Sequence, residues 1–171
     1  QVLELTHCHL GPKAIELLHS STEWSSSNLR ALNLMNNNLG TGGGQVELHL
    51  KAMMESNKRL RTLCGFSEDQ TVADLSNQAL GPPDMMLLAI EIPFNRAIAH
   101  LSELVLASNP LTGAELWDTK GGDPVWYKCD STVGGMQHLA NAIMAAKSLT
   151  TVDVSNCGIG TRGIASLAEN L

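Results

Sequence analysis

A nine-residue pattern recurs five times along the 171-residue chain, and it constrains the fold more than any other feature of the sequence. With few departures it reads Leu-x-Leu-x-x-Asn/Cys-x-Leu-Gly, where x is any residue. Its copies begin at Leu3, Leu32, Ala73, Leu104 and Val152. A pattern that returns at intervals of this size is typical of a chain built by stacking similar units.

Each copy of the pattern predicts a short strand followed by a turn. The first two aliphatic positions are two residues apart, so in an extended chain they point to one face and the residue between them points to the other. The stretches after the pattern carry Leu, Ala and Ile at helical spacing. They are residues 12–18, 83–90, 135–143 and 162–168, with a looser match at 45–55. We therefore expect strands alternating with helices.

These residues resemble the leucine-rich repeat family, specifically its long, ribonuclease-inhibitor-like type. The resemblance implies an α/β fold, a leucine-rich-repeat solenoid that forms a curved right-handed stack. Its parallel β-sheet would lie on the concave face and its helices on the convex face. We expect one domain over residues 1–171 with about five repeats. Because the chain lacks an initial Met and opens inside a repeat, we also expect it to be a fragment of a longer chain.

Two intervals between repeats are longer than the others. Successive copies of the pattern are 29, 41, 31 and 48 residues apart, which predicts insertions near residues 64–71 and 113–131. In the first, a strand that starts at Leu60 is interrupted before Val72. The second contains the aromatic residues Trp117, Trp126 and Tyr127. Insertions in solenoids emerge on one face and often bind partners.

The sixth position of each pattern predicts a ladder of structural side chains. A residue there lies where the chain leaves the strand, and a buried asparagine can satisfy backbone groups that the turn leaves unpaired. Cysteine is a weaker substitute, and Gln78 should alter the bend slightly. The predicted ladder consists of Cys8, Asn37, Gln78, Asn109 and Cys157.

The outward strand positions form a candidate partner-binding surface. Four of them are carboxylates, and none of the outward positions is Lys or Arg. An acidic face of this kind favours a protein partner with a basic or mixed surface. The alternative is that the acids keep an exposed sheet in solution. The candidate residues on the concave face are Glu4, Asn33, Met35, Asp74, Glu103, Val105 and Asp153.

The aromatic insertion is a second candidate surface. Trp117, Trp126 and Tyr127 are residue types that anchor protein interfaces, because they bury a large area at little entropic cost. The alternative is that they fold back and cover the flank of the stack.

Other site types find little support. A net charge of −6 argues against nucleic acid, and no apolar run approaches the ~18 residues of a transmembrane segment. No catalytic or cofactor motif is present, and we expect neither enzyme activity nor a cofactor. Alternation places Cys8 inside the stack, which argues against a metal site at His7-Cys8-His9. The glycines at 40 and 42–44 lack phosphate-loop spacing, and Asp118, Asp123 and Asp130 lack calcium-loop spacing, so a solvated acidic loop is favoured for those aspartates.

Cysteine usage bears on the compartment. Cys8 and Cys157 belong to strands four spacings apart, about 19 Å, too far for a disulfide. The sequence does not exclude a disulfide between Cys64 and Cys129, although free thiols favour an intracellular, cytoplasmic protein.

The function that the sequence predicts is a protein-interaction scaffold or a structural subunit of a large assembly. The alternative is a regulator of an enzyme, of the inhibitor or GTPase-activating type, built on the same repeat.

Overall fold

A computed structural model of the chain describes residues 1–40, 44–94, 98–117 and 125–171. Asp118, Asp123 and the glycines 42 and 43 lie outside these residues. Five strands follow the repeated pattern, each three residues long: β1 (Val2–Glu4), β2 (Ala31–Asn33), β3 (Val72–Asp74), β4 (Glu103–Val105) and β7 (Thr151–Asp153). The helices are α1 (Pro12–Ser20), α2 (Gln45–Ser56), α3 (Pro82–Phe94), α4 (Gly134–Ala145) and α5 (Thr161–Ala168). The second insertion forms the antiparallel hairpin of β5 (Glu115–Trp117) and β6 (Val125–Tyr127).

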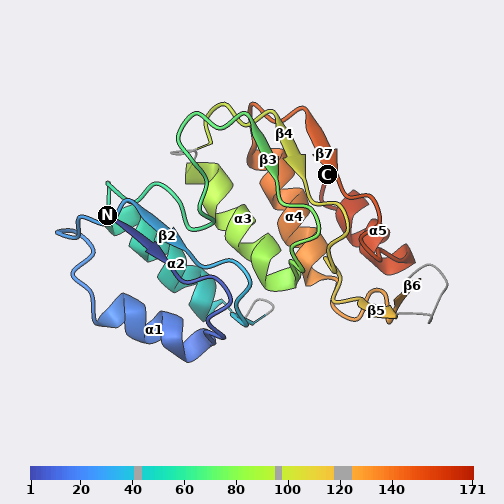
Figure 1. The fold of residues 1–171 in the computed structure, drawn as a ribbon, viewed down its shortest axis with the longest axis horizontal. Helices are drawn as coiled ribbons and strands as arrows, with labels where there is room; N and C mark the ends of the chain where they lie inside the picture. The colour runs from blue at the N-terminus through green and yellow to red at the C-terminus, as the bar shows by residue number, and fades with distance from the viewer. Residues whose placement is uncertain (41–43, 95–97, 118–124) are drawn as a thin grey trace.

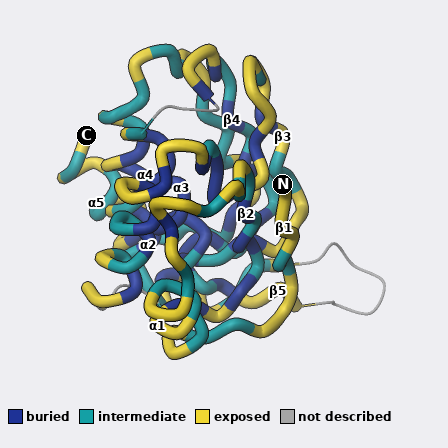
Figure 2. Tube along the Cα trace, turned by 90° about the vertical axis from the view of Figure 1, so that its left-hand side faces the viewer, coloured by how far each residue is buried: buried dark blue, intermediate teal, exposed yellow. Residues whose placement is uncertain are grey.

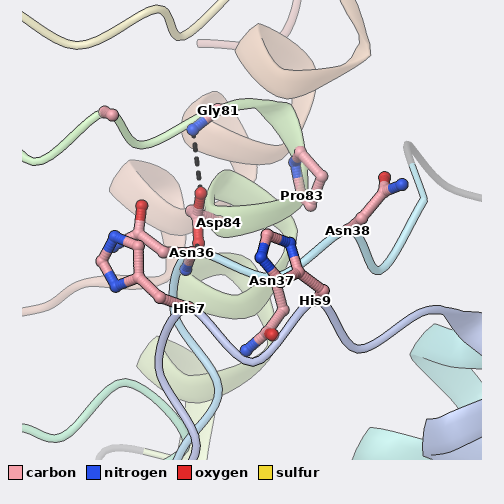
Figure 3. A pocket seen from close by; sticks show the side chains of 9 residues that line it. His7, His9, Asn36, Asn37, Asn38, Gly81, Pro83 and Asp84 are labelled. Atoms are coloured by element: carbon pink, nitrogen blue, oxygen red, sulfur yellow. Dashed lines mark hydrogen bonds between the residues drawn. The ribbon is translucent and has the colours of Figure 1, made fainter.

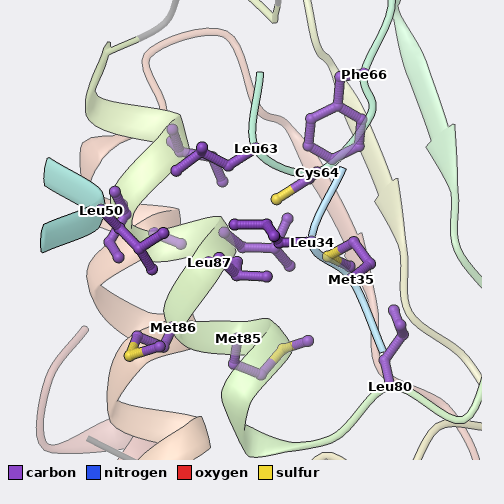
Figure 4. Close-up of a cluster of buried hydrophobic side chains, with 14 of the residues drawn as sticks. Leu34, Met35, Leu50, Leu63, Cys64, Phe66, Leu80, Met85, Met86 and Leu87 are labelled. Carbon is purple, nitrogen blue, oxygen red and sulfur yellow. The ribbon is translucent and has the colours of Figure 1, made fainter. Parts of the chain in front are cut away.

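The strands and helices take opposite sides of the molecule, as the alternating pattern predicts. Figure 2 shows the helices gathered on one side and strands β1 to β4 on the other. The first two aliphatic residues of the patterns point between the two layers, where Leu32, Leu34, Leu104 and Leu106 are fully buried. Helix residues such as Leu50 and Leu87 meet them there (Figure 4). The chain thus forms a solenoid-like α/β stack with an aliphatic core.

One backbone turn recurs after every strand of the pattern. The residue before the sixth position has a φ between 52° and 59° in all five copies. Asparagine adopts this left-handed conformation more readily than most residues, and three of the five positions hold it. The five residues are His7, Asn36, Asn77, Ser108 and Asn156. Their shared geometry shows that the copies are structural repeats as well as sequence repeats.

The parallel strands form two sheets, which corrects the expectation of one continuous sheet. Strand β1 pairs with β2, and β3 pairs with β4, which pairs with β7 (Figure 1). Between them, residues 60–66 lie against β2 through a single parallel bridge from Ala31 to Thr62. The Leu34 N–H donates to the Leu63 carbonyl at 2.9 Å. The first insertion therefore completes a short extra coil at the edge of the first sheet.

Helix α3 explains why the first sheet ends there. In these stacks the N–H groups of one strand donate to carbonyls of the next, as Leu75 donates to Val105. The N–H groups of Leu63 and Cys64 instead donate to Oε2 of Glu91, both at 2.8 Å. A buried backbone donor needs an acceptor, and this carboxylate supplies it in place of a further strand.

A second carboxylate of α3 reaches the same half of the molecule. Asp84 accepts the N–H of Gly81 at its own helix start and, through its other oxygen, the N–H of Asn36 at 2.7 Å. Asp84 and Glu91 are both buried, and that burial raises the pKa of each carboxyl. Seven residues separate them, about two helical turns, so they lie on one face of α3. This face of α3 therefore bonds to the backbone beside the first sheet, at Asn36 and at Leu63 and Cys64.

The ladder exists only where a preceding strand lies in the same sheet. Asn37 Oδ1 accepts the N–H groups of Cys8 and Leu10 from the preceding repeat, while its amide donates to the Leu5 carbonyl. Asn109 makes the matching bonds to the repeat of β3. Cys157 is buried, and its thiol donates to the Leu106 carbonyl.

Cys8 and Gln78 correct the ladder prediction. Each belongs to the first strand of its sheet, and both are exposed. With no earlier strand in the sheet, neither position has carbonyls of a preceding repeat to bond. Asparagine is therefore not needed at either position.

Candidate interaction surfaces

The second sheet aligns two aspartates on its outward face. Its register sets Asp74 beside Val105 and Val105 beside Asp153. Each aspartate accepts the backbone N–H of the serine two residues later, at 3.0 Å from Ser76 and 2.8 Å from Ser155. The Ser76 hydroxyl and backbone N–H lower the pKa of the Asp74 carboxyl, and the Ser155 backbone N–H and hydroxyl lower that of Asp153, because these hydrogen bonds stabilise the ionised form. The sheet thus presents two fixed negative charges, separated by two strand spacings of about 4.8 Å each.

The remaining outward residues are divided between the sheets. Glu103 is half-buried and lies between Val72 and Thr151 in the register of the second sheet. In the first sheet, exposed Glu4 pairs with half-buried Asn33. These outward residues therefore form two short rows instead of one continuous face: Glu4 with Asn33, and Asp74 with Val105 and Asp153.

Met35 does not belong to an outward surface, which corrects its assignment as a partner-binding residue. It is 3% exposed and belongs to the buried cluster with Leu34, Cys64 and Leu80 (Figure 4). The chain after β2 runs against α3, where the Asn36 N–H donates to Asp84, and Met35 beside it is packed into the core.

The hairpin of the second insertion has two different faces. Residues alternate along its strands, so Leu116 and its partner Trp126 share one face while Trp117 and Tyr127 share the other. The indole N–H of Trp126 donates to the backbone carbonyl and the side-chain oxygen of Asn156, both at 2.9 Å. A Cβ at Gly158 would lie 3.0 Å from the indole ring, so the ring rests on the turn after β7. Trp126 thus folds back against the turns on the flank of the stack.

The other hairpin face is open to solvent. Trp117 is 59% exposed and meets the ring of Tyr127 edge-on, with 5.6 Å between ring centroids. The Tyr127 hydroxyl and the Lys128 ammonium both hydrogen-bond to the Glu115 carboxylate. These bonds lower the pKa of Glu115 and raise those of Tyr127 and Lys128. The exposed Trp117 therefore packs against a tyrosine whose hydroxyl is fixed by Glu115.

Asp130 anchors the end of the insertion, which corrects its interpretation as part of a solvated acidic loop. Its carboxylate is buried and accepts the N–H groups of Gly160, Arg162 and Gly163 at the start of α5, at 2.9–3.0 Å. An anion at a helix N-terminus is stabilised by the helix dipole and by these unpaired donors. Sequence reasoning missed this role, for which the glycines at 160 and 163 were the available signal.

A hollow of about 370 Å³ lies between the turns after β1 and β2 and the start of α3 (Figure 3). His7, His9 and Asn38 line it, together with Asp84. Both oxygens of Asp84 are already bonded to backbone N–H groups. Among the described residues, no group of three or more His, Cys, Asp or Glu side chains is arranged to hold a metal ion.

All four cysteines are free, with Cys64 and Cys157 buried. None of the described helices is long and apolar enough to cross a membrane.

Comparison with known proteins agrees with the repeat geometry. A family model described as "Leucine Rich repeat" matches residues 25–46 and 145–168, which include β2 and the β7–α5 unit. These two segments are leucine-rich repeats. Over its whole length it is 29% identical to "NACHT, LRR and PYD domains-containing protein 5" of Mus musculus. The chain spans only 14% of that relative. Leucine-rich repeats stack into extended surfaces, which supports a role in protein–protein interaction.

Proposed function

We propose that this chain is a non-enzymatic protein-interaction module that binds a partner with a basic or mixed surface through the outward side of its two sheets. The observation that carries the proposal is the fixed pair Asp74 and Asp153. Their serine partners lower the pKa of both carboxyls, and no outward strand position holds Lys or Arg to neutralise them. Uncompensated charges of one sign steer a complementary partner and select its orientation.

Glu4 and Glu103 extend the acidic surface, and the exposed Trp117 face of the hairpin adds a second contact. The full α-helix after each strand favours the long, ribonuclease-inhibitor-like repeat type. We place the module inside the cell, where free thiols such as the exposed Cys8 and Cys129 stay reduced. In this proposal it acts as a scaffold or as a subunit of a larger assembly.

The test is capture of partners by this chain, with quantitative mass spectrometry of what it retains. A variant with Glu4→Lys, Asp74→Lys and Asp153→Lys should fold, because all three side chains point away from the core, and should lose the partner. Retention of the same proteins by wild type and variant would contradict the sheet-face proposal. Trp117→Ser then tests the hairpin contact.

The captured protein also separates a scaffold from a regulator. A stable multi-protein assembly supports the scaffold. Stimulated GTP hydrolysis by a captured GTPase, or inhibition of a captured enzyme, would assign regulation instead.

A further inference from the structure

A small cleft lies between the β5–β6 hairpin and the turns that follow β3 and β4. Its volume is about 230 Å³. Asn77 and Ser108 contribute its polar lining, and its apolar lining consists of Ala79, Pro110, Ala114, Leu116 and Trp126.

Several polar groups around the cleft already have partners. The Asn77 N–H donates to the Ala107 carbonyl and the Ser108 N–H to the Ser155 carbonyl, both at 2.9 Å. The Ser108 hydroxyl accepts the Asn156 amide at 3.0 Å. The indole N–H of Trp126 is also bonded to Asn156. What the cleft offers a ligand is therefore mainly apolar surface.

The size of the cleft selects the kind of ligand. Pockets that enclose drug-sized molecules or cofactors hold about 300–1,000 Å³, and this cleft is smaller. It is open to solvent beside Leu116, which is 54% exposed although it forms one wall. Such a cleft suits one aliphatic side chain that projects from a longer molecule, as interface anchors do.

The charge beside the cleft is negative. Asp74 lies three residues before Asn77, which lines the cleft, so their Cα atoms are at most about 10 Å apart. Asp153 lies three residues before Asn156, which bonds to the Trp126 indole of the cleft wall. The nearby Lys128 ammonium is paired with Glu115 on the hairpin, at 2.8 Å. A chain anchored in the cleft and running along the second sheet therefore meets two uncompensated negative charges.

We propose that the cleft and the two aspartates form one site for an extended peptide segment of a partner protein. A Leu, Ile or Val of that segment fills the cleft, and a Lys or Arg about three residues away pairs with Asp74 or Asp153. This inference rests on the proposed function and specifies the chemistry of the partner.

The test uses short serine-rich synthetic peptides that carry one Leu and one Lys, in both orders and from adjacent to about five residues apart. NMR titration of the isotope-labelled chain detects weak binding. We expect saturable shifts of the Trp126 indole N–H and the Leu116 amide, strongest at a separation of about three residues. Replacing Leu by Ser, or Lys by Glu, in the peptide should abolish them.

Variants of the chain locate the two contacts. Leu116→Ser should weaken binding at least about fivefold, while the matched control Val125→Ser, equally exposed on the opposite hairpin face, should not. Asp74→Asn with Asp153→Asn should remove most of the salt dependence, whereas Glu23→Gln on the exposed turn after α1 should leave it unchanged.

Equal binding by Leu116→Ser and Val125→Ser, or peptide shifts that map elsewhere, would overturn the site. The two proposals can fail separately. If the peptides do not bind but the triple charge reversal still releases the captured partner, this site falls and the proposed function stands. If the reversal releases nothing, the sheet-face function falls as well.

Discussion

Glu91 of α3 accepts the backbone N–H of Cys64 at 2.8 Å, and this contact closes the edge of the first sheet. The same oxygen also accepts the N–H of Leu63. Parallel strands leave such donors for the next strand in the sheet, so one carboxylate substitutes for a missing strand. The chain can then begin a second sheet at β3, and the acidic outward residues divide into two rows.

Glu91→Ala should destabilise the fold by about 3 kcal/mol, because two buried N–H groups lose their acceptor at about 1–3 kcal/mol each. Urea denaturation measures the change. The control Glu91→Gln keeps a carbonyl acceptor and should cost less than about 1 kcal/mol. Equal losses in both variants would show that the acceptor is not what stabilises this edge.

The stability should depend on pH through the same carboxylates. Burial raises the pKa of Glu91 above its ordinary 4.5 and that of Asp84 above its ordinary 3.8. Above the ordinary values the folded chain still holds protons that the unfolded chain has released. Rising pH therefore favours unfolding until the raised folded pKa values are passed.

Denaturation at a series of pH values checks this dependence. In Glu91→Gln the loss of stability on raising the pH should be smaller than in wild type, since one of the two groups no longer titrates. The comparison with the variant isolates Glu91 from exposed groups such as Asp74, whose lowered pKa acts in the opposite direction. A difference between the proteins that stays constant with pH would refute the linkage.

Substitution by alanine should lower the stability of the fold much more at Asn109 than at Gln78. Asn109→Ala removes five hydrogen bonds, two accepted by its oxygen and three donated by its amide, and should cost about 3 kcal/mol. Gln78→Ala, at the same repeat position but exposed, should stay within about 0.5 kcal/mol of wild type. Thermal unfolding compares them. A comparable loss at both positions would contradict the dependence of the ladder on a preceding strand.

The repeat register was predictable because it depends on local alternation. The Leu-x-Leu spacing places Leu32 and Leu34 in the core and pairs Asp74 with Asp153 across β4, as observed. The division of the sheet depends on α3, which is distant in sequence from the edge that it closes. One local indication of this division in the sequence is that Gln78 replaces the asparagine of the repeat.

The two acids in the apolar run of residues 82–94 were a further signal of the division. A buried Glu91 inside such a helix requires a polar partner, but the sequence does not say which one. Met35 is buried because the chain after β2 runs against this helix. The separate roles of Trp117 and Trp126 follow from hairpin alternation, which the sequence alone did not establish.

Asp130 and Gly160 should be energetically coupled. A Cβ at residue 160 would collide with the Asp130 carboxylate, so Gly160→Ala should weaken the cap on α5. Asp130→Ala alone should cost about 1–2 kcal/mol, as expected for loss of a helix cap. The double variant should be more stable than the sum of the single changes implies, because removal of the carboxylate also removes the collision. Additive losses in a denaturation cycle would contradict this packing.

The central claim is that a partner binds the acidic outward side of the sheets. Its most direct test is the equilibrium affinity of the captured partner for three proteins, measured by calorimetry. These are wild type, the triple reversal Glu4→Lys, Asp74→Lys and Asp153→Lys, and a matched reversal of the exposed Glu23, Glu55 and Glu169, which lie outside the strands. We predict at least about a tenfold loss for the first triple variant and little change for the second. Equal affinities for all three proteins would contradict the account.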